Sequence, residues 1–385
     1  MKPKQITQAY IAACIGMAFF GITMVALGAV LPALSRHLSL TAAHQATLAS
    51  ALTGGIFAGS IVFGPVCDHY GHKGIFLAAC VMVLLGLLGI AQARGFAILV
   101  PSYFLVGAGG GILNGQTNTL VSDLYDTRRR GPRLSLLGAF YGVGGMAITL
   151  LVSLFKYTVA YDVVLKLLVA FMVLCAIYCA TVRFPAPKAA QSFPLGKAVR
   201  MLGDPVLLVM SMVLMLESTI ETITNNLSTI YFQNHGLDDV VLLLTVMMAS
   251  LTVARFALSW LAGKIAQQSL LYLFLSVLLA GFVMVLLGRN FAMATVAMIL
   301  IGVGTAATYP VVLGQIGTAY AQLSGTAFGI AITTALAGST VLNAMVGSLL
   351  LHIYPYVMMA AVAAMMLLYT AGNVLLKNNK YNSLS

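Results

Sequence analysis

The sequence predicts an all-α integral membrane protein with twelve transmembrane helices in two pseudo-symmetric six-helix bundles. The first observation is composition: 61% of the 385 residues are apolar and 8% are charged. Soluble domains average about 45–50% apolar and about 25% charged residues. A soluble chain of this length cannot bury so many apolar side chains, which excludes an ordinary globular enzyme. The second observation is a series of twelve apolar segments, and the third is the distribution of basic residues between them.

Each apolar segment reaches about the 20 residues that a helix needs to span a bilayer. Backbone groups in lipid must be satisfied within the segment, so the segments are expected to be helices. The first follows Met1-Lys2-Pro3-Lys4 and is too long for a secretory signal, so we interpret it as an uncleaved first span. The expected spans are 8–34, 43–66, 74–93, 96–122, 134–155, 163–182, 205–232, 240–262, 270–288, 291–318, 324–350 and 354–376.

The basic residues indicate the orientation. With a cytoplasmic N-terminus, 14 Lys and Arg side chains fall in inside loops and five fall outside. This asymmetry follows the positive-inside rule and predicts a multi-pass protein of a bacterial inner (plasma) membrane with both termini in the cytoplasm. The rule also accounts for the net charge of +11, so we expect no binding to nucleic acid.

The chain divides near its middle. A polar, proline-containing break over 183–204 separates six spans in 1–182 from six in 205–385, which predicts two bundles joined by a cytoplasmic linker. An offset of 195 residues aligns Gly107 with Gly302 and Gly109 with Gly304, as expected for homologous halves.

The loop after the second span carries a recognisable motif. It has Gly64, Asp68 and Gly71, followed by His72 and Lys73. It resembles the signature loop of the major facilitator superfamily, with histidine at two positions, 69 and 72, where that family usually has a basic residue. The resemblance implies the major facilitator fold and a gating role for the loop. Asp68 is expected to pair with the next inside loop at Arg128, Arg129 and Arg130; the alternative is a solvated carboxylate that only sets topology.

Within the superfamily, spans four and ten resemble the fucose/glucose permease branch. Span four has a Gly-x-Gly-x-Gly pattern from Gly107 followed by Asn114 and Asn118, and span ten has Gly302-x-Gly304 followed by Thr308-Tyr309-Pro310. This resemblance implies sugar:proton symport. That branch often has carboxylates in spans one and four, and here the matching stretches contain none.

The seventh span contains the sharpest local signal. Glu217 and Glu221 lie four residues apart, so they share one helix face, which Asn225 continues. An ionised carboxylate in the hydrocarbon costs at least about 2.5–3.5 kcal/mol, so two on one helix need a function or a buried partner. We interpret the pair as proton-coupling residues. The structural alternative is that both are protonated and bonded to another helix.

Other polar side chains within the spans are candidates for solute binding. Neutral amide and hydroxyl groups suit a polyhydroxylated ligand, because together they both donate and accept hydrogen bonds. Each one taken singly also fits an interhelical hydrogen bond. Arg255 is a cation within the eighth span that either snorkels or pairs with a carboxylate. The predicted substrate-binding residues are Asn114, Gln116, Asn118, Tyr141, Asn225, Asn226, Tyr309 and Gln315.

The prediction is therefore a secondary transporter rather than an enzyme, working by alternating access. Its expected substrate is a small polar solute, a sugar or polyol first, moved with a proton. The alternatives are an exporter or facilitator of an amphipathic compound such as a drug or siderophore, and a non-transporting sensor. We expect a monomer in the lipid bilayer with no cofactor and no metal: the sequence has no nucleotide-binding P-loop, and its five cysteines lack zinc spacing.

Overall fold

The computed structural model is all-helical over the residues that it describes, which confirms the predicted fold class. It describes residues 2–125, 127–155, 159–185, 201, 203–261, 266–288, 290–320, 324–345 and 351–382. Within those ranges, the side chains of several stretches, among them 64–70 and 127–132, are not described.

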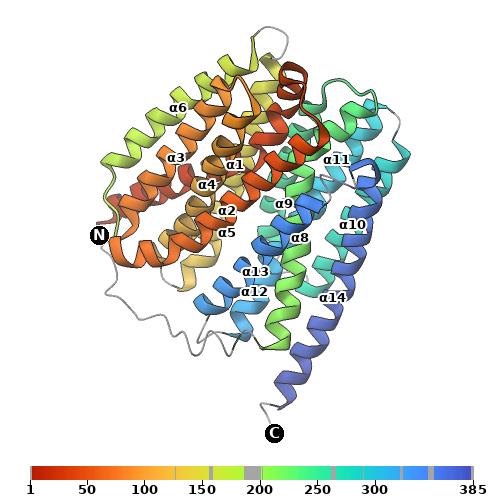
Figure 1. Ribbon diagram of the computed structural model, residues 1–385. Coiled ribbons are helices and arrows are strands. Elements are labelled where there is room, and N and C mark those ends of the chain that lie inside the picture. The colour runs from red at the N-terminus through yellow and green to blue at the C-terminus, as the bar shows by residue number, and fades with distance from the viewer. Residues whose placement is uncertain are drawn as a thin grey trace.

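Two successive groups of helices make up the molecule (Figure 1). The first group comprises α1 (Pro3–Leu38), α2 (Ala42–Tyr70), α3 (His72–Gln92), α4 (Phe96–Leu124), α5 (Thr127–Phe155) and α6 (Tyr161–Thr181). The second comprises α8 (Pro205–Asn234), α9 (Val240–Leu261), α10 (Gln267–Leu287), α11 (Phe291–Thr305), α12 (Thr308–Ala319), α13 (Ser324–Met345), the short 3₁₀ helix η3 (Leu351–Ile353) and α14 (Tyr354–Asn382). The first group lies to the left in Figure 1 and the second to the right.

Local sequence signals explain where two helices of the second group begin. Asp204 caps α8 by accepting hydrogen bonds from the backbone amides of Val206 and Leu207 at 2.9 and 3.3 Å, and Pro205 occupies the first helical position. Asn290 caps α11 in the same way, accepting from the amide of Met293 at 2.9 Å. Both helices therefore begin where the sequence supplies an acceptor for free amides.

The two groups repeat one packing scheme. In the first, α4 packs on α2 and α3, α1 packs on α5, and α3 packs on α6; in the second, α11 packs on α9 and α10, α8 packs on α13, and α10 packs on α14. The aligned glycines make matching contacts. A Cβ on Gly107 would meet the carbonyl oxygen of Leu52 on α2, and a Cβ on Gly302 would meet that of Met247 on α9. Helices approach this closely only where side chains are absent.

The tenth span differs from its counterpart because it is broken. The structure has α11 and α12 separated at residues 306–307, where one continuous helix was expected over 291–318. Pro310 explains the break: it has no amide hydrogen to bond the carbonyl of residue 306, and its ring crowds that carbonyl. Across the described residues, eleven segments are long and apolar enough to span a membrane, and α13 adds a shorter apolar stretch, Ile330–Leu342.

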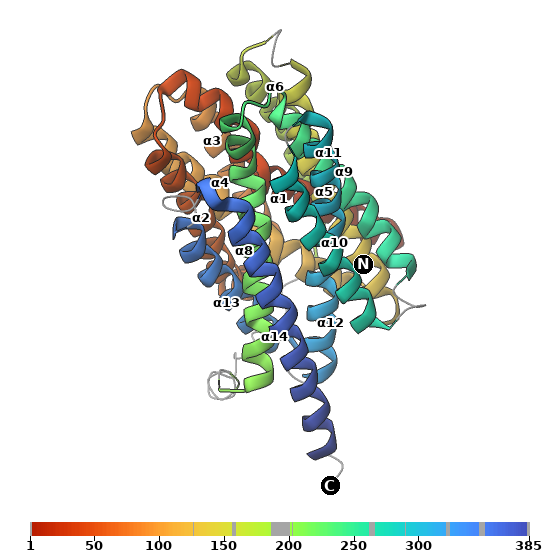
Figure 2. The ribbon, with the colours of Figure 1, turned by 90° about the vertical axis from the view of Figure 1, so that its right-hand side faces the viewer.

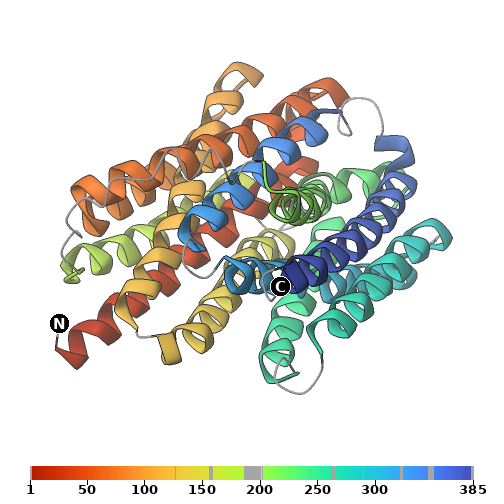
Figure 3. The same cartoon turned by 90° about the horizontal axis from the view of Figure 1, so that it is seen from below.

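Three helix pairs form most of the contact between the two groups: α1 with α8, α5 with α9, and α2 with α13. Figure 3 shows α13 in blue beside the orange helices of the first group, and Figure 2 shows α14 alongside α8. The contact of α1 with α8 is close, since a Cβ on Gly28 would meet the carbonyl oxygen of Asn225. Thr229 Oγ1 also donates a hydrogen bond to the Gly28 carbonyl at 2.9 Å. The C-terminal halves of α1 and α8 are therefore held together.

Candidate functional site

The acid pair lies near the middle of α8, on the side that faces the first group of helices. Glu217 is buried with 1% of its surface exposed, and its Oε2 has no hydrogen-bond partner among the described residues. Asn225, two turns further along, is fully buried. The predicted polar face of this helix therefore points into the protein and away from lipid, as an intramembrane carboxylate requires.

Tyr141 on α5 connects the pair to the first group of helices. Its hydroxyl donates to Glu221 Oε1 at 2.7 Å and accepts a hydrogen bond from Asn225 Nδ2 at 3.3 Å. Its ring is buried and packs against Phe20 on α1, with ring centroids 5.5 Å apart. The three predicted site residues Tyr141, Glu221 and Asn225 thus form one hydrogen-bonded cluster between α5 and α8.

Arg255 on α9 completes the cluster with a positive charge. Its guanidinium carbon lies 5.1 Å from the centre of the Tyr141 ring, in the geometry of a cation–π contact. Its Nη1 donates to the carbonyl of Gly138 at 3.2 Å, and its charge interacts with Glu217. Sequence reasoning flagged Arg255 as a cation in a span but did not place it in the site. The signal was available: an arginine within an apolar span, in the same half as two glutamates within a span, needs a partner.

The helix break brings a fourth element to the cluster. Thr308 is the first residue of α12; it is fully buried near Glu217, and its hydroxyl has no hydrogen-bond partner among the described residues. Tyr309, the next residue, interacts electrostatically with Glu221, Arg255 and Glu217. The site therefore combines residues of α5, α8, α9 and the start of α12, which is the arrangement expected of a discontinuous transporter helix beside its binding site.

Several predicted substrate-binding residues lie elsewhere or point to other partners. Asn118 Nδ2 donates to Asn114 O and Oδ1 within α4, at 2.8 and 3.2 Å. Gln116 is fully buried and donates to the His72 carbonyl at 3.3 Å, and Gln315 donates to Tyr369 Oη at 2.8 Å. Asn226 lies on α8 beside the pair, but neither polar atom of its side chain has a partner among the described residues. The structure shows hydrogen bonds of Gln116 and Gln315 only to residues outside the acid cluster.

The predicted gating loop is described in part. Gly71 and His72 are buried, Lys73 is exposed, and His72 Nε2 lies 3.2 Å from Asp123 Oδ2 at the end of α4. This contact joins the loop to another helix of the same half. The predicted latch residues Gly64, Asp68, Arg128, Arg129 and Arg130 have side chains outside the described residues, so the latch stays a prediction.

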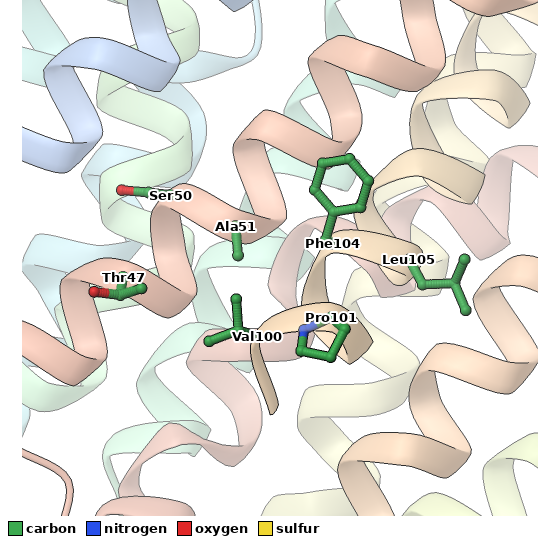
Figure 4. Close-up of a pocket in the computed structure, with 7 residues that line it drawn as sticks. All are labelled: Thr47, Ser50, Ala51, Val100, Pro101, Phe104 and Leu105. Carbon is green, nitrogen blue, oxygen red and sulfur yellow. The ribbon is translucent and has the colours of Figure 1, made fainter. Parts of the chain in front are cut away.

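A groove between α2 and α4 lies apart from the cluster (Figure 4). Its two hydroxyl groups are used within α2: Thr47 Oγ1 donates to the Ala43 carbonyl at 2.8 Å and Ser50 Oγ to the Ala46 carbonyl at 2.9 Å. No polar side chain of the lining is left to orient a solute, so we do not assign the site here. The lining residues are Thr47, Ser50, Ala51, Val100, Pro101, Phe104 and Leu105.

Comparison with known proteins identifies the family. Residues 11–343 match the Major Facilitator Superfamily, so the chain belongs to it and is a multi-pass membrane transporter of that family. The fold is similar to that of a D-xylose–proton symporter, with a TM-score of 0.78, 13% identity and coverage of 96% of this chain and 97% of the other. It is also similar to the nucleoside transporter NupG, with a TM-score of 0.77, 13% identity and coverage of 96% and 99%. At these identities the likeness shows the fold alone.

Curated relatives match shorter stretches. The efflux pump dotC of Dothistroma septosporum is 30% identical over 113 residues, covering 29% of this chain and 19% of that protein. Multidrug resistance protein 3 of Bacillus subtilis is 30% identical over 108 residues, covering 28% and 21%. The 4-hydroxybenzoate transporter PcaK of Acinetobacter baylyi is 32% identical over 129 residues, covering 33% and 28%. The matched stretches thus span less than a third of each of these relatives.

Proposed function

We propose that the protein is a proton-coupled secondary transporter of a small polar solute, a sugar or polyol first, that works by alternating access. The observation that carries the proposal is the cluster between the two groups of helices, in which Glu217, Asn225 and Tyr141 are buried and Glu221 is partly buried. A carboxylate that exchanges a proton must sit where the two halves meet, so that one side and then the other reaches it. Amide and hydroxyl groups beside it supply both donors and acceptors for a polyhydroxylated solute.

The proposal includes the setting of the site. The two six-helix domains are 1–182 and 205–385, joined by a cytoplasmic linker over 183–204. The protein acts as a monomer in a bacterial inner membrane with both termini in the cytoplasm. The distribution of basic residues supports this orientation.

The experiment uses purified protein in two steps. A thermal-shift panel of sugars, polyols, amino acids, organic acids and amphipathic drugs first finds a solute that stabilises the protein. That solute is then offered to proteoliposomes with and without an inward proton gradient. We expect a sugar or polyol to stabilise the protein and to accumulate only with the gradient. Accumulation that survives a protonophore would refute proton coupling.

Two substitutions locate the coupling. Glu217→Gln and Glu221→Gln are each expected to abolish gradient-driven accumulation and to preserve counterflow exchange, because the amide keeps the shape but carries no exchangeable proton. Asp162→Asn is the matched control, since Asp162 pairs with Lys166 at 2.8 Å on the exposed face of α6. If both glutamine variants accumulate solute normally, the acid pair is not the coupling site.

The second candidate is export of an amphipathic compound. Two relatives that match parts of this chain are named an efflux pump and a multidrug resistance protein, which favours it. Stabilisation by amphipathic drugs and by no sugar or polyol, together with drug sensitivity of a deletion strain, would support export over sugar uptake.

A further inference from the structure

Tyr141 is too enclosed to be a freely available solute-binding group. It is 4% exposed, its hydroxyl has two hydrogen-bond partners, and both ring contacts are to side chains of other helices. A solute that used this hydroxyl would have to displace Glu221 or Asn225 from it. The role of this residue must therefore be sought in what it joins.

Its polar partners all come from the other half of the chain. Glu221 and Asn225 lie on α8 and Arg255 lies on α9, while Tyr141 belongs to α5. The glycine that follows Tyr141 brings α5 against α9, since a Cβ on Gly142 would meet Thr252 Oγ1. Tyr141 therefore lies in the interface of α5 with α8 and α9, whose contacts must change during alternating access.

The cluster contains two carboxyl groups and one positive charge. The described charged and titratable side chains that face Glu221 are Tyr141 on α5, Glu217 on α8 and Tyr309 on α12, with Arg255 of α9 over the Tyr141 ring. One positive charge beside two carboxyls is neutral overall when one carboxyl is ionised and one carries a proton. Glu221 accepts the hydrogen bond of the Tyr141 hydroxyl, while the buried Glu217 Oε2 has no partner among the described residues.

We propose that Tyr141 is the positioning residue that couples the proton on the acid pair to the contact between the two halves. This inference rests on the proposed function. When Glu221 is ionised, the hydroxyl of Tyr141 donates to it in a charge-assisted hydrogen bond that holds α5 against α8. When a proton binds the Glu221 carboxylate, the charge and much of the bond strength are lost, and the interface is free to rearrange. The solute and the proton then both affect the contact between Tyr141 on α5 and Glu221 on α8.

The test compares Tyr141→Phe, Glu221→Gln and the double variant. Phenylalanine keeps the ring, and with it the contacts to Phe20 and Arg255, and removes only the hydroxyl. Tyr103→Phe is the matched control, because Tyr103 is fully buried in α4 and its hydroxyl has no partner among the described residues. Each protein is measured for thermal stability in detergent from pH 5 to 8, and for uptake, proton uptake and counterflow in proteoliposomes.

We expect Tyr141→Phe to lower gradient-driven accumulation about tenfold, the effect of one hydrogen bond to a charged group, and to leave counterflow within about twofold. The pH profile of uptake should differ from that of the wild type, because the Glu221 carboxyl has lost the hydroxyl that donates to it. In the Glu221→Gln background the tyrosine substitution should cost clearly less thermal stability than in the wild type, because glutamine accepts only a neutral hydrogen bond from Tyr141. Tyr103→Phe should change none of these.

Two results would overturn the inference. One is a Tyr141→Phe protein with the pH profile of Tyr103→Phe. The other is a double variant whose loss of thermal stability equals the sum of the losses of the two single variants. If wild-type uptake shows no proton coupling, the proposed function fails. The stability cycle in detergent still decides whether Tyr141 acts through Glu221, because it needs no transport.

Discussion

The two halves of the chain share a packing scheme but place different chemistry at their centres. In the first half, α4 runs without interruption through Leu113-Asn114-Gly115. At the corresponding positions, 195 residues later, the second half has Thr308-Tyr309-Pro310 and a break between α11 and α12. The same architecture therefore gives an intact helix on one side and a helix start that faces two carboxyls on the other.

The glutamates are also distributed unequally between the two halves. The only two glutamates of the sequence, Glu217 and Glu221, are both on α8, and α1, its counterpart, carries no acidic residue. The first half contributes to the cluster through Tyr141 and the Gly138 carbonyl. The comparison teaches that pseudo-symmetry governs how the helices pack, while both carboxyls of the cluster belong to the second half and the first half contributes hydrogen-bond partners.

The largest expected effect comes from preventing the halves from meeting. Gly28→Val places a side chain against the Asn225 carbonyl, where α1 and α8 touch. Overpacking at such a contact costs about 1–3 kcal/mol, so we expect solute uptake to fall about tenfold to hundredfold. Gly74→Val is the control, since a Cβ there has no atom within 4 Å. Equal uptake rates in the two variants would show that this contact is not part of the transport cycle.

The next largest effect is a loss of solute affinity, which we expect for the cluster amide Asn225 and not for the amides Gln116 and Gln315. Asn225→Ala removes an amide whose Oδ1 has no partner among the described residues and can bond a solute, so solute binding should weaken about tenfold. Gln116→Ala and Gln315→Ala, whose side chains bond to His72 and Tyr369, should leave affinity within about twofold. Solute titration of thermal stability measures all three. A large loss of affinity in either glutamine variant would move the site away from the acid pair.

A smaller effect is expected at the broken helix. Thr308→Val removes the hydroxyl beside Glu217 and keeps the shape of the side chain. If this hydroxyl bonds Glu217 during the transport cycle, that hydrogen bond contributes about 1 kcal/mol, and accumulation should drop about fivefold with counterflow retained. Thr305→Val is the control, since that hydroxyl donates to Ile301 O of its own helix at 3.1 Å. Matching accumulation ratios for the two would argue against a role for the break in coupling.

The smallest effect on transport is expected from substitutions at the glycines that pack equivalent helices in the two halves. Gly107→Ala and Gly302→Ala each place a methyl group against a backbone carbonyl, on α2 and on α9 respectively. Each should lower stability by about 1–3 kcal/mol, with equal effects in the two halves and little change in solute affinity. Gly138→Ala, with no atom within 4 Å of its Cβ, should be neutral. Strongly unequal losses of thermal stability would break the proposed equivalence.

Much of this architecture was predictable. Continuous apolar runs predict the helices because lipid leaves the backbone no other way to bond, and the spacing of Glu217, Glu221 and Asn225 predicts a single polar face. The residue pattern could not distinguish Gln116 and Gln315 from Asn225, since all three are amides within apolar spans. Their partners lie on other helices, and no local rule names a partner far away in sequence.

The sequence by itself determined the membrane-spanning class, the helical segments, and the placing of both glutamates on one face, because hydropathy and helical periodicity act over a few neighbouring residues. Only the tertiary structure decided that Tyr141, 80 residues before Glu221, donates a hydrogen bond to it, and that Arg255 covers the ring of Tyr141. Those contacts depend on which helices pack together and how closely. Interhelical approach is decided jointly by glycines and side chains on both partners, such as Gly28 with Asn225 and Gly142 with Thr252.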